Sequence, residues 1–155
     1  MLDFNLVSEF TPIQRRSFEV ATVDGAGVSI INPNSANPLL MGEWLELNAS
    51  SQLIRGAGNG ATGPSFVCLG ERGRTDMQAL GKAPVGFMGD YEAETLIMDA
   101  SGLSVGSALM VNDVTFGSLT RRGLILQAGG GLTVARVTRL PANNNGYLRF
   151  QKVSN

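Results

Sequence analysis

Short apolar runs separated by turn-forming residues recur along most of the chain. About a dozen runs rich in Val, Ile, Leu and Phe are punctuated by Gly, Asn, Pro and Asp. Runs of this length and composition are typical of β-strands. Their regular spacing predicts an all-β fold, a single-domain antiparallel β-sandwich or barrel. The predicted strands lie at 17–23, 27–31, 43–47, 52–55, 66–69, 85–88, 94–98, 108–111, 114–116, 123–127, 132–140 and 146–151.

Helical periodicity is almost absent, whereas turn signals are frequent. The only helical candidate is "GERGRTDMQALG" at 70–81, which predicts at most one or two turns. The "DGAG" at 24–27 and the "NNNG" at 143–146 contain the Asp-Gly and Asn-Gly pairs that favour tight hairpins. The second pair predicts that the chain closes on a C-terminal hairpin.

The N-terminal segment has a pattern of its own, which divides the chain into an N-terminal arm at 1–17 and a β-domain at 18–155. Leu2, Phe4 and Leu6 alternate with polar residues, as in a strand that buries one face. Two interpretations stay open. The segment is either an ordinary first strand of its own domain or an extended arm that adds to a neighbouring chain.

Length and charge restrict the class of protein. A chain of 155 residues is long enough for one domain with a sizeable core. Its formal net charge is −1, so we expect neither nucleic acid nor an anionic membrane as a partner. Cys68 is the single cysteine, which excludes a disulfide within the chain and indicates synthesis in a reducing compartment. The first residues lack the basic start and long apolar run of a signal peptide.

The residues available for chemistry are few. The chain has no His, which removes the commonest general base and the usual zinc ligands. Gly56, Gly58 and Ala61 in "RGAGNGATGPS" have the spacing of a dinucleotide-binding loop, but "TGPSFVCLG" follows them and favours a strand over the required helix. We therefore interpret 55–65 as a surface loop between strands, and Cys68 as a core residue.

Asp90, Glu92 and Glu94 fall on one face of a predicted strand. Such a row can bind calcium or act as an acid/base pair, yet no calcium-loop spacing accompanies it. A solvated or interface face is the favoured interpretation. Trp44 is interpreted as a core residue or an interface anchor, because no second Trp or Tyr lies near it in the sequence.

The basic residues point to contacts between chains. Twelve residues are Lys or Arg, and of these only Lys82 and Lys152 are lysine. Arginine is the residue that interfaces favour for planar, multiple hydrogen bonds. Local arginine pairs therefore predict either contacts with carboxylates of a neighbouring subunit or simple surface solubility. The predicted subunit or capsid contact residues are Leu2, Phe4, Leu6, Phe10, Arg15, Arg16, Arg72, Arg74, Arg121 and Arg122.

Four segments in order carry a resemblance to a known family. They are "NPLLMGEWLEL", "GERGRTDMQALGKAPVGFMGDYEAET", "DASGLSVGSALMVNDVT" and "VTRLPANNNGYLRF". Together they resemble the small capsid decoration, or cement, proteins of tailed bacteriophages. The similarity runs over residues 37–151, its most specific part is the closing segment, and "MLDFNLVSEF" lies outside it.

The resemblance implies a structural virion protein that binds the outer surface of an icosahedral phage capsid and stabilises it by bridging major capsid protein subunits. It implies a place on the capsid exterior after synthesis in the bacterial host cytoplasm, with copies of itself, as dimer or trimer, among its partners. It implies no enzyme activity, no cofactor and no metal.

Two other functions stay open: a tail or baseplate β-module of the virion, and a carbohydrate-binding β-sandwich. The carbohydrate-binding function needs exposed aromatic residues, and the chain has only seven Phe, two Tyr and one Trp.

Overall fold

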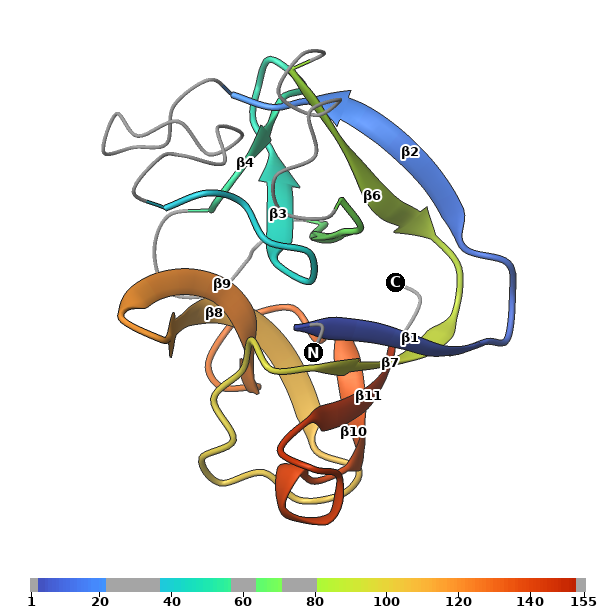
Figure 1. The fold of residues 1–155 in the computed structure, drawn as a ribbon, viewed down its shortest axis with the longest axis vertical. Coiled ribbons are helices and arrows are strands. Elements are labelled where there is room, and N and C mark those ends of the chain that lie inside the picture. Colours follow the sequence, from blue (N-terminus) through green and yellow to red (C-terminus); the bar gives the residue numbers. More distant parts are fainter. Residues whose placement is uncertain (1–2, 22–36, 57–63, 71–80, 153–155) are drawn as a thin grey trace.

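The fold is built almost entirely from antiparallel strands in two sheets (Figure 1). The computed structural model describes residues 3–21, 37–56, 64–70 and 81–152. The strands are β1 (Phe4–Glu9), β2 (Gln14–Glu19), β3 (Trp44–Leu47), β4 (Leu53–Ile54), β5 (Phe66–Cys68), β6 (Lys82–Met88), β7 (Tyr91–Thr95), β8 (Ala108–Phe116), β9 (Leu119–Leu126), β10 (Ala135–Arg139) and β11 (Leu148–Lys152), with one 3₁₀ turn, η1 (Pro141–Asn143). The all-β prediction is confirmed.

The six-stranded sheet has the order β1-β7-β11-β10-β8-β9. Alternation along its strands decides which side chains are buried, because successive side chains point to opposite faces. Leu109 and Val111 of β8 point inward, as do Leu148 and Phe150 of β11. These residues form the main core, which lies between the two sheets and also takes in Trp44 from the five-stranded sheet.

The five-stranded sheet has the order β2-β6-β5-β3-β4 and curls until its ends meet. A parallel bridge pairs Val20, directly after β2, with Leu53 of β4, and this contact closes the sheet into a small barrel. The barrel has a core of its own, because β3 and β5 send alternate residues to opposite faces. Their inward residues Leu45, Phe66 and Cys68 fill the barrel, whereas Trp44 and Val67 face the six-stranded sheet.

The C-terminal hairpin forms as the sequence predicts. β10 pairs antiparallel with β11, and the connection ends with Asn145 and Gly146 at φ 53 and 87. Both values lie in the left-handed region that Asn and Gly tolerate. The hairpin occupies the middle of the six-stranded sheet, with β11 next to β7 and β10 next to β8.

Several strand boundaries differ from the prediction. The runs at 108–111 and 114–116 form the single strand β8, because Asn112 and Asp113 keep their pairing with β9. The run at 94–98 lies mostly beyond β7, which begins at Tyr91, and β2 begins earlier than the run at 17–23. The predicted strand 27–31, the hairpin at 24–27 and most of 70–81 and 55–65 lie outside the described residues.

The N-terminal segment corresponds to the first of its two interpretations. β1 pairs antiparallel with β7 of the same chain and forms an edge of the six-stranded sheet. The register shifts between Leu6 and Ser8, which makes Val7 a bulged residue that is 41% exposed. For residues 4–9, the interpretation as an arm extended away from its own domain is therefore wrong. Their inward side chains complete the core of this chain.

Candidate interaction site

The predicted contact residues of β1 divide between core and surface. Phe4 is 1% exposed, and its ring lies 6.4 Å from that of Phe150, both measured between centroids. Leu6 is partly buried and packs against the same core. A contact role for Phe4 is thus wrong for the folded chain, because the two sheets already cover its side chain. Leu2 lies outside the described residues.

Phe10, Arg15 and Arg16 lie on the surface. Phe10 is 57% exposed and follows β1, and both arginines are exposed on β2. The guanidinium of Arg16 lies 4.9 Å above the ring centroid of Phe18. Together with the bulged Val7, these residues form what we call the N-terminal edge (Val7, Phe10, Arg15 and Arg16). It combines exposed apolar side chains with positive charge, a composition that protein interfaces favour.

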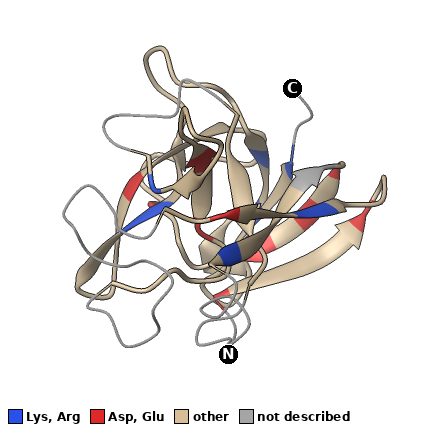
Figure 2. Cartoon of the chain, turned by 90° about the horizontal axis from the view of Figure 1, so that it is seen from above, with Lys and Arg blue, Asp and Glu red and all other residues tan. Residues whose placement is uncertain are grey.

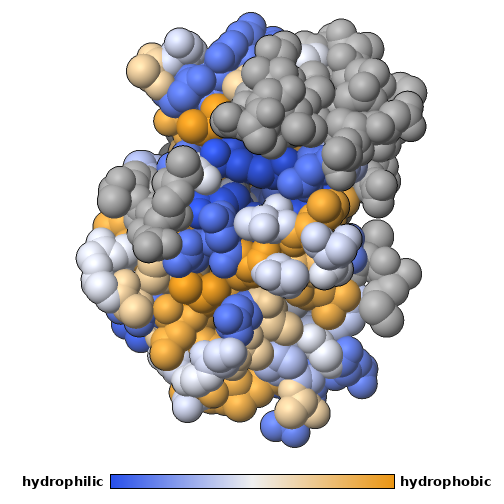
Figure 3. Space-filling model, turned by 90° about the vertical axis from the view of Figure 1, so that its left-hand side faces the viewer, coloured by the Kyte–Doolittle hydropathy of each residue, from blue (hydrophilic) through white to orange (hydrophobic). Residues whose placement is uncertain are grey.

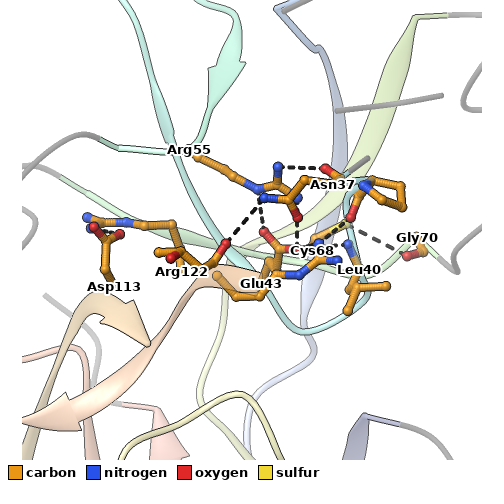
Figure 4. Close-up of polar contacts among 11 residues, drawn as sticks. Asn37, Leu40, Glu43, Arg55, Cys68, Gly70, Asp113 and Arg122 are labelled. Atoms are coloured by element: carbon orange, nitrogen blue, oxygen red, sulfur yellow. Dashed lines mark hydrogen bonds and ion pairs between the residues drawn. The ribbon is translucent and has the colours of Figure 1, made fainter. Parts of the chain in front are cut away.

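Arg121 and Arg122 are buried, so the prediction that they contact a neighbouring subunit is wrong. Arg121 is 3% exposed and donates to the Glu43 carboxylate and to the Pro38 carbonyl. Arg55 donates to the same carboxylate through its Nε, at 2.7 Å, and through its Nη2, at 3.0 Å (Figure 4). Glu43, which is fully buried, therefore holds two guanidinium groups.

A third arginine extends this network toward the surface. Arg122 donates to Asp113 at 3.0 Å and to Glu46 at 3.5 Å, and Asp113 is 50% exposed. Three carboxylates thus face three guanidinium groups. The network joins the barrel, through β3 and β4, to β8 and β9 of the six-stranded sheet. Sequence reasoning missed it because ion pairs between residues about 80 positions apart leave no local pattern.

Glu92 and Glu94 lie on the outer face of the six-stranded sheet and have partners from other strands. Glu94 accepts from Arg149 at 2.9 Å and from Asn144 at 3.0 Å, and Glu92 accepts from Thr138 at 2.9 Å. Burial alone raises the pKa of Glu94, but the bonds from Arg149 and Asn144 outweigh it and leave that pKa lowered. Figure 2 shows charged residues of both signs along the strands.

The aromatic residues with polar groups are buried. Trp44 and Tyr91 are each 1% exposed, and Tyr147 is 8% exposed. Cys68 is also fully buried, and burial raises the pKa of its thiol to about 12. Its interpretation as a core residue is confirmed. Within the described ranges, no three His, Cys, Asp or Glu side chains come together as metal ligands.

A groove with a volume of about 480 Å³ lies on the outer face of β8 and β9. Met110 and Ile125 stand opposite each other across the two strands, Asn112 follows on the same face, and the loop 128–131 forms the remaining wall. None of these lining residues is charged. Exposed Leu126 and Leu132 flank the loop. Hydrophobic residues gather in the lower half of the face that Figure 3 presents.

The groove has a weak sequence signal. "AGGGL" at 128–132 indicates a loop with almost no side chains, but nothing in the sequence shows that it folds back over β8. In the structure Gln127 Nε2 donates to the carbonyls of Gly129 and Gly131, at 3.3 and 3.0 Å, and this fixes the loop's curvature.

No helix among the described residues is long and apolar enough to cross a membrane. Comparisons with protein-family models, with curated proteins and with solved structures return no match.

Proposed function

We propose that this chain is a structural virion protein that binds the outer surface of an icosahedral phage capsid and stabilises it by bridging major capsid protein subunits. The resemblance of residues 37–151 to capsid decoration proteins supports the proposal. Its most specific segment, "VTRLPANNNGYLRF", forms β10, η1 and β11 in the middle of the larger sheet. This segment therefore lies in the framework of the fold, not in a peripheral loop.

The observation that carries the proposal is the N-terminal edge. β1 and β2 follow each other in the chain, yet β1 is an edge of the six-stranded sheet and β2 is an end strand of the five-stranded sheet, which meets β4 only through the bridge at Val20. The connection between them presents Phe10 at 57% exposure beside a strand with two exposed arginines. An apolar anchor next to basic groups suits a bridging protein, because an aromatic anchor supplies contact energy and arginine pairs with carboxylates across an interface.

The buried aromatics count against carbohydrate binding. A sugar platform needs exposed rings, and Trp44, Tyr91 and Tyr147 are all inside the fold. A tail or baseplate module would share this fold and these surfaces, so only the location in the particle separates it from a capsid protein.

Co-sedimentation with phage shells that lack the protein tests the proposal. We expect saturable binding to shells at a fixed ratio to major capsid protein, and no binding to isolated tails. Phe10→Ser with Arg15→Glu should weaken the binding, whereas Arg136→Glu, an exposed arginine on β10, should not. Binding to tails alone would assign the chain to the tail, and binding to neither would refute a structural virion role.

A further inference from the structure

The turn between η1 and β11 contains an exposed Asn-Gly pair, Asn145–Gly146. In such a pair the backbone nitrogen of the glycine can attack the amide carbon of the asparagine side chain, because glycine has no Cβ that shields the nitrogen. This reaction makes asparagine one of the chemically labile residues of proteins. Asn145 is therefore a candidate for spontaneous deamidation.

The folded turn keeps the glycine nitrogen from reacting. The Gly146 N–H donates to the Pro141 carbonyl at 3.0 Å, and the N–H of the next residue, Tyr147, donates to the Asn144 carbonyl at 2.9 Å. Before it attacks, the Gly146 nitrogen must give up its proton, so its bond to Pro141 has to break. The reaction therefore depends on local opening of the turn.

Asn144 fixes the turn against the rest of the sheet. Its side chain is buried, and its Nδ2 donates to the Tyr147 carbonyl and to Glu94 Oε1, each at 3.0 Å. Glu94 belongs to β7, the strand next to β11. Opening the turn therefore breaks hydrogen bonds within the turn and to a neighbouring strand together, which keeps the open form rare.

We propose that Asn145 is a deamidation site that the folded hairpin protects and that unfolding exposes. In the open chain the Gly146 nitrogen bonds to Asn145 Cγ and the Cγ–Nδ2 bond breaks. The amide nitrogen leaves as ammonia, with the proton that the Gly146 nitrogen gave up. Water then opens the resulting cyclic imide at either of its carbonyls. One opening gives aspartate at position 145, and the other gives isoaspartate, in which the main chain runs through the former side chain.

The two products differ in whether the turn can form again. Aspartate, like asparagine, tolerates the φ of 53 at position 145. Isoaspartate adds a carbon to the main chain before Gly146, so the hydrogen bonds from Gly146 and Tyr147 lose their alignment. β11 lies between β7 and β10, so this change would disturb the middle of the six-stranded sheet.

Peptide mass spectrometry on the full chain measures the protection. Samples are kept at mildly alkaline pH with and without guanidinium chloride, and the acid formed at position 145 is followed with time. Asn59, which precedes Gly60 in the second Asn-Gly pair of the chain, is the reference in denaturant. There we expect similar rates at the two asparagines. In buffer Asn145 should react about 10-fold more slowly, because several hydrogen bonds must break first. An equal rate at Asn145 in both conditions, or no reaction in denaturant, would overturn the proposal.

Asn144→Ala tests which contacts protect Asn145. The variant removes the side-chain bonds to Glu94 and Tyr147 and leaves the reacting pair intact. In buffer we expect Asn145 to react about 5-fold faster than in the natural chain, and in guanidinium chloride at the same rate. Asn143→Ala, at an exposed position of the same turn, is the matched control and should leave both rates unchanged. An unchanged rate for Asn144→Ala in buffer would refute protection by the hairpin.

Refolding separates the two products. Chains aged in guanidinium chloride are returned to buffer, and the folded fraction is isolated by size-exclusion chromatography. We expect this fraction to carry asparagine or aspartate at position 145 and to be depleted of isoaspartate. Asn145→Asp should refold with the circular dichroism spectrum of the natural chain. Isoaspartate at position 145 in equal amounts in the folded and misfolded fractions would contradict the inference.

Discussion

At the scale of single residues, Glu43 is the centre of the polar contacts between barrel and sheet. Its carboxylate accepts from Arg55, Arg121 and the backbone N–H of Leu40. A buried charge is tolerable only when its partners compensate for lost hydration, and removing one partner leaves the others uncompensated.

Glu43→Gln should therefore lower the free energy of unfolding by about 3 kcal/mol or more. The amide keeps the shape of the side chain but leaves two buried guanidinium groups without a carboxylate. Denaturant titration measures the loss. Glu92→Gln is the matched control, because Glu92 and its ion-pair partner Arg149 are both partly exposed, and their pairing should contribute at most about 1 kcal/mol. Equal losses in the two variants would contradict this account of the network.

Gly123 of β9 allows a close approach of the backbone. A Cβ there would lie 2.4 Å from the carbonyl oxygen of Ile97 and 2.7 Å from Val114 Cγ2. We expect Gly123→Ala to cost about 1 to 3 kcal/mol, as overpacked sites do. Gly130→Ala, where a Cβ has open space, should have almost no effect on thermal unfolding. An unchanged melting temperature for Gly123→Ala would show that β9 and Ile97 do not pack this closely.

Cys68 should be chemically silent in the folded chain. Burial raises the pKa of its thiol to about 12, so almost no thiolate exists at neutral pH, and the barrel blocks access to the sulfur. A thiol reagent should label it only after unfolding in guanidinium chloride. Rapid labelling of the native protein would show that the barrel is open.

At the scale of elements, local patterns predict strands well and their ends poorly. Alternation and turn residues located nearly every strand of the described residues. They divided β8 because Asn112 and Asp113 resemble a turn, whereas ladder pairing with Gly123 and Arg122 keeps them extended. Pairing with a distant strand overrides local preference, and one sequence does not display such pairing.

Only the part of the candidate site that lies near the start of the chain was predictable from the sequence. Phe10, Arg15 and Arg16 lie on the surface as expected for contact residues, but Phe4, Arg121 and Arg122 do not. The sequence shows where the arginines are but not whether they are buried, which here depends on the carboxylates of Glu43, directly before β3, and of Glu46, on β3. The groove was likewise unpredictable, because it forms between a hairpin and a loop that folds back.

The pairing of β7 with β11 gives a pH-dependent prediction. The pKa of Glu94 is lowered in the folded chain. Its carboxylate therefore contributes its full stabilisation of the fold above the ordinary pKa of 4.5, and this stabilisation is lost as the pH falls through the lower pKa of the folded state. Glu94→Gln should thus be less stable than the natural chain at pH 7 by up to about 1 kcal/mol, the range of partly exposed pairs. Urea titrations should show this difference shrinking below about pH 4. A difference that grows in acid would contradict the pairing.

At the scale of the whole molecule, the barrel and the six-stranded sheet share elements. β3 and β5 contribute Leu45, Phe66 and Cys68 to the barrel core, and Trp44 and Val67 to the core between the sheets. Neither core can lose its packing without disturbing the other. The charge network around Glu43 adds a second connection.

Calorimetry should accordingly show one cooperative unfolding transition, with calorimetric and van't Hoff enthalpies equal. Phe66→Ala in the barrel and Leu109→Ala in the main core should both lower the temperature of that single transition. Each should lower the free energy of unfolding by about 2 to 5 kcal/mol. Two separate transitions, each sensitive to only one of these variants, would show that the barrel and the sheet are independent units.

We propose that this chain occupies the exterior of a phage shell, and electron microscopy of particles with and without the protein tests this location. We predict added density on the outer face of the shell at regular lattice positions, contacting more than one subunit of major capsid protein. Particles of identical exterior, with the added density confined to the tail, would contradict the claim.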